Sequence, residues 1–332
     1  MLASPSPSHM QVWACLAYGG PEQLQLQRRP IPTCRPDELL VRVHATTIAS
    51  ADVRIRTLAL PRGFGWLGRL IFGLRRPRQP VLGTDLAGVV VDVGPDVGEY
   101  RIGDRVLAMP GAAMGCHAEY RTVRSNAAIA RIPEGISFED AAALAFGGTT
   151  ALHFLRCSDL KSGDALLVIG ASGAVGSAMV QLGRHLGASV TAVTSTPNLD
   201  LVRSLGAGHV LDYTRQRLHD LPHTYDVIAD TVAASSFKSC LPLLNERGRY
   251  LAIAGGLPDM LARRRGTRRS ISGMAREHSE DLATLLRLTA EGKLRPVIDH
   301  VVDWPDLPRA HAHVETGHKR GSLVVRPPQC PS

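Results

Sequence analysis

A glycine-rich stretch in the middle of the chain could hold a dinucleotide through its backbone: Gly170-Ala171-Ser172-Gly173-Ala174-Val175-Gly176. The wholly apolar run Ala165–Ile169 precedes it, which is typical of a buried parallel strand. An apolar stripe at helical spacing follows, made by Val175, Ala178, Met179, Leu182 and Leu186. Between a strand and a helix, such glycines permit a tight turn and let a pyrophosphate approach the free N–H groups of the helix. The pattern therefore favours a dinucleotide site over a strand–helix turn without a ligand.

The end of the next expected strand, Ser189–Val193, bears on which dinucleotide fits. NAD sites usually place an acidic residue there, about 20 residues after the glycines. Here Thr194-Ser195-Thr196 follows, and no carboxylate occurs before Asp200. A carboxylate would repel a 2′-phosphate and hydroxyls can bond to it, so NADP is favoured. Arg203 and Arg215 are the nearest cations for that phosphate, although such arginines are more often ordinary surface residues.

Neither the histidines nor the cysteines provide a complete metal-binding motif. None of the 13 histidines occurs in H-E-x-x-H, the one H-x-x-x-H pair is His219 and His223 with Pro222 between them, and His311 and His313 should point in different directions on a helix. The six cysteines are scattered without a C-x-x-C pair, so we expect neither a disulfide framework nor a Cys-rich zinc site. No G-x-S-x-G serine elbow occurs either. We expect no metal, and a reducing cytoplasm as the location.

Two kinds of element must position these motifs. The part from Gln11 to about Pro133 is predicted to be β-rich, with strands at Leu39–Val43, within Gly83–Gly94 and within Gly103–Met109. From Ile136 onwards strands and helices alternate. The further expected elements are a helix at Asp200–Leu205 and strands at His209–Leu211, Tyr225–Ala229 and Arg249–Ala254. The predicted fold class is α/β, with a doubly wound parallel sheet beside a smaller β domain.

The tail is predicted to return to the first domain. It contains a helix at Glu280–Glu291 and short strands at Val297–Val302 and Ser322–Val325. The expected domains are thus 11–135 together with 281–332, and 136–280 between them. Met1–Met10 is Ser/Pro-rich and reads as a disordered leader or tag, not a secretory signal.

The formal net charge of +8 comes largely from two arginine clusters, Arg75, Arg76 and Arg78, then Arg263–Arg265 with Arg268 and Arg269. No aromatic residues alternate with them, so we interpret them as solvated faces and expect no nucleic-acid partner. No apolar stretch is long enough to cross a bilayer. The segment Leu58–Leu74, with Phe64 and Trp66, could be a helix packed on the β domain, a lid over a pocket, or a weak membrane-surface contact.

Several stretches, in this order, resemble the medium-chain dehydrogenase/reductase superfamily, and specifically its zinc-free quinone oxidoreductase branch. They are Gly83-Thr84-Asp85-Leu86-Ala87-Gly88-Val89-Val90, Gly103-Asp104-Arg105-Val106, Ala118-Glu119-Tyr120, Gly147-Gly148-Thr149-Thr150-Ala151, the glycine loop, Glu291-Gly292-Lys293-Leu294 and Gly317-His318-Lys319-Arg320-Gly321. The resemblance extends from about Gln11 to Val325. It implies a GroES-like domain beside a Rossmann domain, with NADPH in the cleft between them.

The resemblance also bears on zinc. Where zinc-dependent relatives place catalytic ligands, this chain has Ala49, Thr84-Asp85 and about Phe146, and Cys116 stands alone near the four-Cys lobe. Beside the expected nicotinamide, Ala49-Ser50-Ala51-Asp52 replaces an Asn-Pro-x-x-Asp-like stretch. Ser50 and Asp52 are the only weak candidates for a proton donor, and Asp52 is better explained as a helix N-cap. Ser322 stands where relatives usually carry Lys.

By the same resemblance, the pyrophosphate lies against Ser172, Gly173, Ala174 and Val175. Ser195 and Tyr213 lie near the 2′-phosphate, although Tyr213 could equally be a half-buried strand end. Thr150, Gly255 and Gly256 face the nicotinamide side. Phe64, Trp66 and Tyr120 are the expected substrate-pocket residues.

The expected function is a zinc-independent transfer of a hydride from NADPH to a quinone or an α,β-unsaturated carbonyl, in which the cofactor carries the chemistry. The alternatives are an alcohol dehydrogenase or carbonyl reductase on the same fold, which would lack the polarising Lewis acid, and a non-catalytic NADPH-responsive binding protein. A homodimer through the sheet edge near Arg268–Gly273 is expected from the resemblance.

Overall fold

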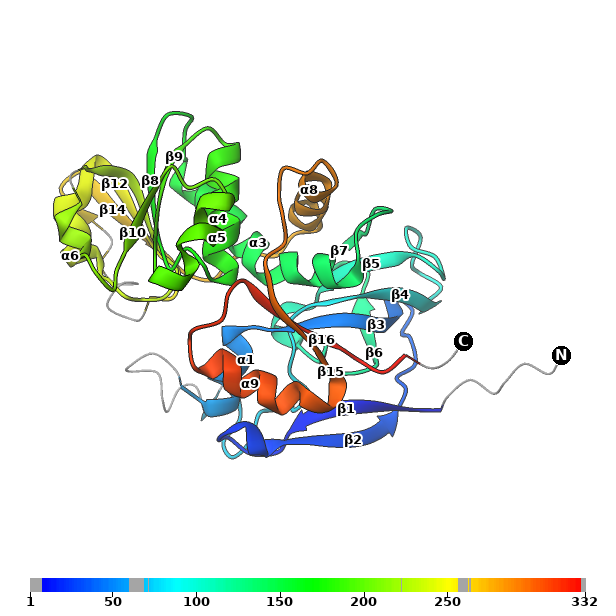
Figure 1. The fold of residues 1–332 in the computed structure, drawn as a ribbon. Coiled ribbons are helices and arrows are strands. Elements are labelled where there is room, and N and C mark those ends of the chain that lie inside the picture. The colour runs from blue at the N-terminus through cyan, green and yellow to red at the C-terminus, as the bar shows by residue number, and fades with distance from the viewer. Residues whose placement is uncertain are drawn as a thin grey trace.

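The computed structural model describes residues 8–59, 69–70, 72–221, 223–255, 262 and 264–329. These residues form two sheet-based domains that meet along a long helix, α3 (Phe138–Ser158), as Figure 1 shows. One hydrophobic core runs through both domains. It contains Leu107 of the first domain, Ala145 of α3, Val168 of the second domain and Leu285 of the tail, all with little or no exposed surface.

The second domain is a seven-stranded sheet in the order β10-β9-β8-β11-β12-β14-β13, parallel except for β13. This order reverses between β8 and β11, which is the arrangement of a doubly wound dinucleotide-binding sheet. The strands are β8 (Ala165–Ile169), β9 (Ser189–Thr194), β10 (His209–Asp212), β11 (Tyr225–Asp230), β12 (Leu244–Ala252), β13 (Arg264–Arg265) and β14 (Arg268–Ser272). Its helices are α4 (Ala174–His185), α5 (Leu199–Ser204) and α6 (Phe237–Cys240).

The first domain is a mostly antiparallel sheet in the order β15-β16-β3-β4-β5-β7, with β6 also paired to β3. A two-stranded ribbon, β1 with β2, lies beneath it (Figure 1). The strands are β1 (His9–Cys15), β2 (Leu24–Pro30), β3 (Glu38–Ile48), β4 (Leu86–Val93), β5 (Arg105–Met109), β6 (Tyr120–Arg124) and β7 (Ala128–Arg131). Helix α1 (Ser50–Thr57) follows β3 directly.

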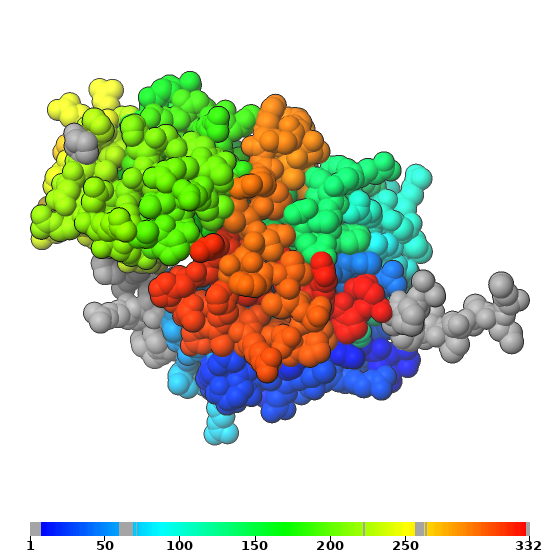
Figure 2. All heavy atoms as spheres, viewed as in Figure 1, coloured from blue at the N-terminus to red at the C-terminus, as the bar shows by residue number. Residues whose placement is uncertain are grey.

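The C-terminal tail joins the first domain. Helix α8 (Ser279–Ala290) packs on α3, and β15 (Ile298–Asp303), α9 (Leu307–Glu315) and β16 (Ser322–Arg326) follow it. Strand β16 pairs antiparallel with β3, Leu323 opposite Ile48. In Figure 2 the orange and red surface of this tail fills the space between the green second domain and the blue start of the chain.

Most expected elements occur within a few residues of their predicted bounds, and two details differ. The first strand begins at His9, so the last residues of the expected leader belong to the fold. Strand β12 begins at Leu244, five residues before its predicted start. The polar residues Asn245-Glu246-Arg247 do not have the apolar pattern of a buried strand, although Leu244 already pairs with β11. The segment Leu58–Leu74 falls largely outside the described residues, so its three interpretations stay open.

No helix in the described part of the chain is long and apolar enough to cross a membrane. The described cysteines, Cys15, Cys34, Cys116, Cys157 and Cys240, are all free thiols. Arg264 and Arg265 are exposed on β13, as a solvated face requires, whereas Arg268 donates through Nε to the carbonyl oxygens of Leu244 and Asn245.

Candidate cofactor cleft

The loop between β8 and α4 has a shape that only glycine permits at two positions. Gly170 has φ +78°, and a Cβ there would lie 2.6 Å from the Thr231 side chain, in the loop after β11. A Cβ on Gly176 would lie 2.1 Å from the carbonyl oxygen of Gly170, so the first turn of α4 could not approach the strand. These two glycines therefore build the tight connection itself.

Gly173 has a different reason to be glycine. A Cβ there would meet only the Gly170 carbonyl oxygen, at an ordinary 3.5 Å, so the space over this residue is open. Gly173 is the N-cap of α4, and no side chain caps the helix. The first N–H groups of a helix have no partner within it and attract anions. An open space over uncapped N–H groups at the switch point of the sheet fits the pyrophosphate of a dinucleotide.

Helix α3 holds this loop in place from the other side. A Cβ on Gly147 would lie 2.5 Å from the carbonyl oxygen of Ala174, so this glycine lets α3 pack directly on the start of α4, whereas a Cβ on Gly148 would lie 2.8 Å from the Leu285 side chain of α8. Thr150, predicted to face the nicotinamide, lies one turn further along α3 and is 8% exposed. Gly255 follows the end of β12, and Gly256 lies outside the described residues.

A hydroxyl cluster lies at the end of β9, where the 2′-phosphate is expected. Thr194 Oγ1 donates to Ser172 Oγ at 3.0 Å, and Asn198 Nδ2 lies 3.2 Å from both Ser172 Oγ and Ser195 Oγ. Tyr213 donates its backbone N–H to the Thr194 carbonyl, and its side chain is 57% exposed. The structure thus brings Ser172, Ser195 and Tyr213 to one end of the sheet.

A carboxylate lies closer to this cluster than the local sequence indicated. Asp212, the last residue of β10, accepts hydrogen bonds from Thr196 Oγ1 and Thr214 Oγ1, and these bonds lower its pKa. Arg215 Nε lies 3.7 Å from Asp212 Oδ2, so this cation is held at the same end of the sheet. The residues that follow β9 could not predict Asp212 at this position, because Asp212 belongs to the neighbouring strand β10.

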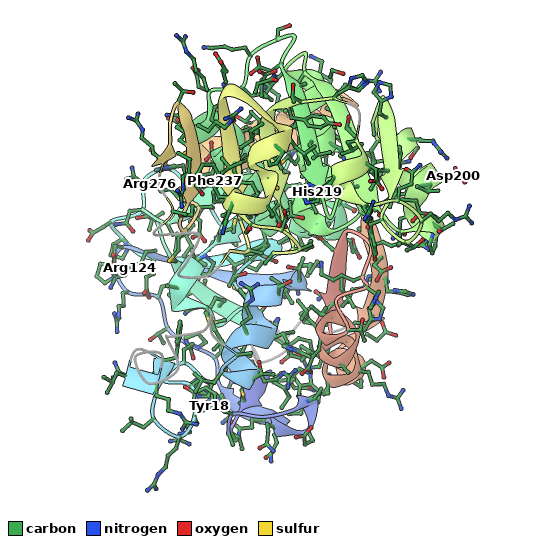
Figure 3. All side chains as sticks on the ribbon, turned by 90° about the vertical axis from the view of Figure 1, so that its left-hand side faces the viewer. Tyr18, Arg124, Asp200, His219, Phe237 and Arg276 are labelled. Atoms are coloured by element: carbon green, nitrogen blue, oxygen red, sulfur yellow. The ribbon has the colours of Figure 1, made fainter. Side chains whose placement is uncertain are left out.

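Arg203 forms an ion pair away from the hydroxyl cluster. Its guanidinium pairs with Asp200 at 3.0 Å, and Asp200 lies on the outer flank of the second domain, as Figure 3 shows. Of the two expected phosphate cations, Arg215 is therefore the better placed.

The tail contributes a lysine that the sequence reasoning missed. Gly321 donates its N–H to the carbonyl of Ser172 at 2.8 Å, which ties the glycine loop to the start of β16. Lys319 Nζ donates to the Gly321 carbonyl at 2.5 Å. Burial lowers the pKa of Lys319 to about 8, against the opposing influence of Asp299 and Asp85. Lys319 is part of the Gly317–Gly321 motif, but its position beside the glycine loop depends on how the tail folds back and is not visible in the motif.

On the first-domain side, the residues at the positions of zinc ligands in relatives do not form a metal-binding set. Ala49 and Phe146 offer no ligand atom, and the Thr84 hydroxyl is buried without a hydrogen-bond partner. Asp85 is fully buried and accepts hydrogen bonds from the Thr47 N–H at 2.9 Å and the Thr47 hydroxyl at 2.7 Å. One carboxylate engaged in this way does not fit a catalytic zinc, which needs three converging protein ligands.

Asp52 is not the N-cap that we expected. The cap of α1 is Ala49, and Asp52 is the third helical residue, whose carboxylate reaches back to accept from the Ala49 N–H at 2.8 Å. Its other oxygen accepts from the Gly83 N–H at 2.9 Å. Asp52 therefore still stabilises the start of α1, and it also holds the segment that leads into β4 through its hydrogen bond with Gly83. Ser50, the first helical residue, is exposed.

Burial dominates the electrostatics of these carboxylates. It raises the pKa of Asp85 to about 7, despite the Thr47 hydrogen bonds, and the nearby Asp52 raises it further. Burial likewise raises the pKa of Asp52 to about 6. Two fully buried carboxyl groups of the first domain, Asp52 and Asp85, therefore have raised pKa values.

The expected substrate pocket is less well defined. Phe64 and Trp66 lie outside the described residues. Tyr120 begins β6 opposite Arg42 and is half-buried. A hollow of about 420 Å³ lies elsewhere, where β3 and β16 meet the start of α3, and His44, Phe138, Trp304 and Arg326 line it. Tyr120 is not among the residues that line it.

Comparisons with known proteins agree with this architecture. The model of the alcohol dehydrogenase GroES-like domain matches residues 35–148, and that of the zinc-binding dehydrogenase family matches residues 205–325. The chain is 31% identical to the 2-methylene-furan-3-one reductase of Solanum lycopersicum, over 97% of this chain and 80% of that protein. The NADPH-dependent alkenal/one oxidoreductase of Arabidopsis thaliana, a chloroplastic protein, gives the same identity and coverage.

Among solved structures, the quinone oxidoreductase from Coxiella burnetii superposes with a TM-score of 0.83 at 27% identity, covering 96% of this chain and 99% of that one. The match covers nearly the whole of both chains. The chain belongs to the quinone oxidoreductase branch of the medium-chain dehydrogenase/reductase superfamily.

Proposed function

We propose that the protein transfers a hydride from NADPH to an electron-poor acceptor, either an α,β-unsaturated carbonyl or a quinone, without a catalytic metal. The observation that carries the proposal is the open space over Gly173 at the uncapped start of α4. The relatives named for alkenal/one, furanone and quinone reduction support the acceptor class.

In this proposal the backbone from Ser172 to Val175 binds the pyrophosphate. Ser195, Tyr213 and Arg215 bind the 2′-phosphate. The nearby Asp212 carboxylate would repel that phosphate, but the hydrogen bonds from the Thr196 and Thr214 hydroxyls and the contact with Arg215 partly offset its charge. Thr150, Gly255 and Gly256 border the nicotinamide.

NADPH, when bound, supplies the hydride, and the chain's own residues supply orientation and a site from which water is excluded. Hydride addition leaves negative charge on the acceptor oxygen, and a proton must then reach the product. Asp52 is poorly suited to deliver it, because both carboxylate oxygens already accept backbone hydrogen bonds. Ser50 is exposed, so solvent or Ser50 remains the proposed source.

Alcohol dehydrogenation is the weaker second function. It depends in zinc-containing relatives on a Lewis acid that polarises the carbonyl. The side chains of Ala49, Thr84 and Phe146 provide no ligand set for one, whereas reduction of a conjugated acceptor needs none.

We further propose the division into 11–135 with 281–332 and 136–280, the pocket at Phe64, Trp66 and Tyr120, and a cytoplasmic location. We also propose a homodimer through the sheet edge near Arg268–Gly273, where β13 lies outside β14. The free thiols of the described cysteines support a reducing compartment.

The test is a panel assay of the purified, chelator-treated protein. NADPH and NADH consumption are followed side by side with a quinone, an enal, an enone and a simple ketone. We expect consumption with the conjugated acceptors and NADPH. Consumption only with the ketone, or only after zinc is added, would overturn the proposal.

A further inference from the structure

Three side chains that the sequence patterns did not connect meet at the free edge of the first-domain sheet. Asp299 Oδ2 lies 2.7 Å from His313 Nε2 and 3.4 Å from His300 Nδ1. The three potential ligand atoms all lie within 4.8 Å of one another. Within the described residues, this is the one group of three or more such side chains with this geometry.

A bulge in β15 explains how two consecutive residues can share one side of a strand. Ile298 pairs with Ser322 and His300 pairs with the next residue, Leu323, so Asp299 is the extra residue between them. Such a bulge re-aims the side chains around it, whereas a regular strand would send neighbours to opposite faces. Bulges are often found at sheet edges beside functional sites.

The third side chain comes from α9. Leu307, Ala310, His311 and Val314 face the core, and His313 lies on the flank that faces β15. The two imidazole rings stand nearly perpendicular, with centroids 5.6 Å apart. Their side chains are 64% and 39% exposed for His300 and His313, whereas Asp299 is 9% exposed. The group is therefore open to solvent on one side and backed by protein on the other.

We propose that Asp299, His300 and His313 form a binding site for a divalent transition-metal ion such as Zn²⁺ or Co²⁺. Two imidazoles and one carboxylate suit these ions, while Mg²⁺ and Ca²⁺ prefer sets of oxygen ligands. Tetrahedral bonds of about 2.0–2.1 Å place ligand atoms roughly 3.4 Å apart. The pair at 3.4 Å already has that separation, and the 2.7 Å pair needs to open by a few tenths of an ångström once the metal replaces the hydrogen bond.

The neighbouring charge sets a limit on affinity. Lys319 is the cation that faces Asp299, since this carboxylate raises the pKa of the lysine. A second positive charge nearby weakens the attraction between the carboxylate and the metal. Three protein ligands leave further positions for water, so we expect micromolar rather than zinc-finger affinity.

This site would be separate from the cofactor cleft. Its ligands belong to β15 and α9, whereas the glycine loop connects β8 to α4. Binding would join an edge strand to the end of a helix, and so stabilise the tail. The inference does not depend on the proposed reductase activity.

The experiment uses the full-length, chelator-treated protein and Co²⁺ as the probe, with d–d absorption and calorimetry as readouts. We expect one Co²⁺ per chain, displaced by Zn²⁺, and a rise of several degrees in Tm on Zn²⁺ addition. His300→Ala and His313→Ala should each weaken Co²⁺ binding at least tenfold. The matched control is His318→Ala, which removes an exposed histidine outside the group.

A second potential ligand pair requires its own control. Cys157 Sγ lies 3.6 Å from His153 Nε2 on the exposed face of α3. The titrations are therefore repeated in Cys157→Ser. Because His300 is largely exposed, His300→Ala should fold even if His313→Ala does not. Absence of Co²⁺ absorption, or Co²⁺ binding that His300→Ala leaves unchanged, would overturn the proposal. The reductase proposal is tested separately: if His300→Ala and the wild type have equal activity with NADPH, metal binding and reductase activity are independent.

Discussion

The candidate cofactor site of the second domain and the buried acidic region of the first domain are built differently. In the second domain, backbone groups of Gly170, Gly173 and Gly176 shape the candidate site, and no described side chain lies within 4 Å of a Cβ built on Gly173. On the first-domain side, buried side chains of Asp52, Asp85 and Thr47 form a hydrogen-bonded layer. A backbone site follows from a short local motif, whereas a buried side-chain layer depends on which strands become neighbours. The following substitutions test this contrast, from the largest expected effect to the smallest.

Gly173→Val should separate binding from folding. Because a Cβ at this position meets no close neighbour, we expect little change in Tm. The added side chain would occupy the space of the pyrophosphate, so NADPH affinity should fall about 100-fold, or about 2.7 kcal/mol. Fluorescence titration of NADPH and a melting curve measure both. Gly98→Val, at another glycine with open space around it, is the control. Normal NADPH affinity in Gly173→Val would show that the cofactor lies elsewhere.

Asp85→Asn should alter the pH dependence of stability. The folded state raises the pKa of Asp85 from 3.8 to about 7, so it holds the proton more tightly than the unfolded chain. That contribution to stability is complete below pH 3.8 and is lost as the pH rises to about 7. From about pH 5 to about pH 8 the wild type should therefore lose about 2.7 kcal/mol relative to Asp85→Asn, since about two pH units of that range lie below the folded pKa and each corresponds to about 1.4 kcal/mol.

Urea unfolding of both proteins at the two ends of that pH range measures this difference. The amide introduced by Asp85→Asn would keep an acceptor for the Thr47 N–H, so the variant should fold. A stability difference that is the same at both pH values would mean that Asp85 does not titrate in this range.

Lys319→Met should weaken the link between the tail and the cofactor side. The Lys319 ammonium bonds to Gly321, whose N–H in turn holds the glycine loop. Loss of this cation should lower kcat/KM for NADPH about tenfold, and Lys319→Arg should restore part of it. Unchanged kcat/KM in Lys319→Met would show that the Lys319 charge does not contribute to NADPH use and that this residue only packs in the structure.

Ser195→Asp should give the smallest effect and tests cofactor choice. A second carboxylate beside Asp212 would repel the 2′-phosphate, so NADPH affinity should fall about fivefold while NADH affinity stays the same. Titrations with both cofactors measure the ratio. Equal losses for NADPH and NADH would argue against a 2′-phosphate at Ser195.

Most of the fold could be predicted because apolar periodicity is local. The run at Ala165–Ile169 became β8, and the stripe starting at Val175 became α4. The placement of Asp212 and Lys319 could not be predicted in this way, since each reaches the site from a different strand or from the tail. The same applies to Asp299, His300 and His313, which meet only because β15 carries a bulge. Asp52 shows a subtler limit: its stabilising role was expected, but not its position in the helix.

Direct hydride transfer is the central claim, and deuterium labelling tests it. The chelator-treated protein is incubated with NADPH that carries deuterium at the transferring C4 position of the nicotinamide, together with an α,β-unsaturated ketone. Mass spectrometry and NMR then locate the label. The proposal predicts one deuterium on the β-carbon of the saturated ketone. Reduction without deuterium in the product, or deuterium on the carbonyl carbon of an allylic alcohol, would contradict it.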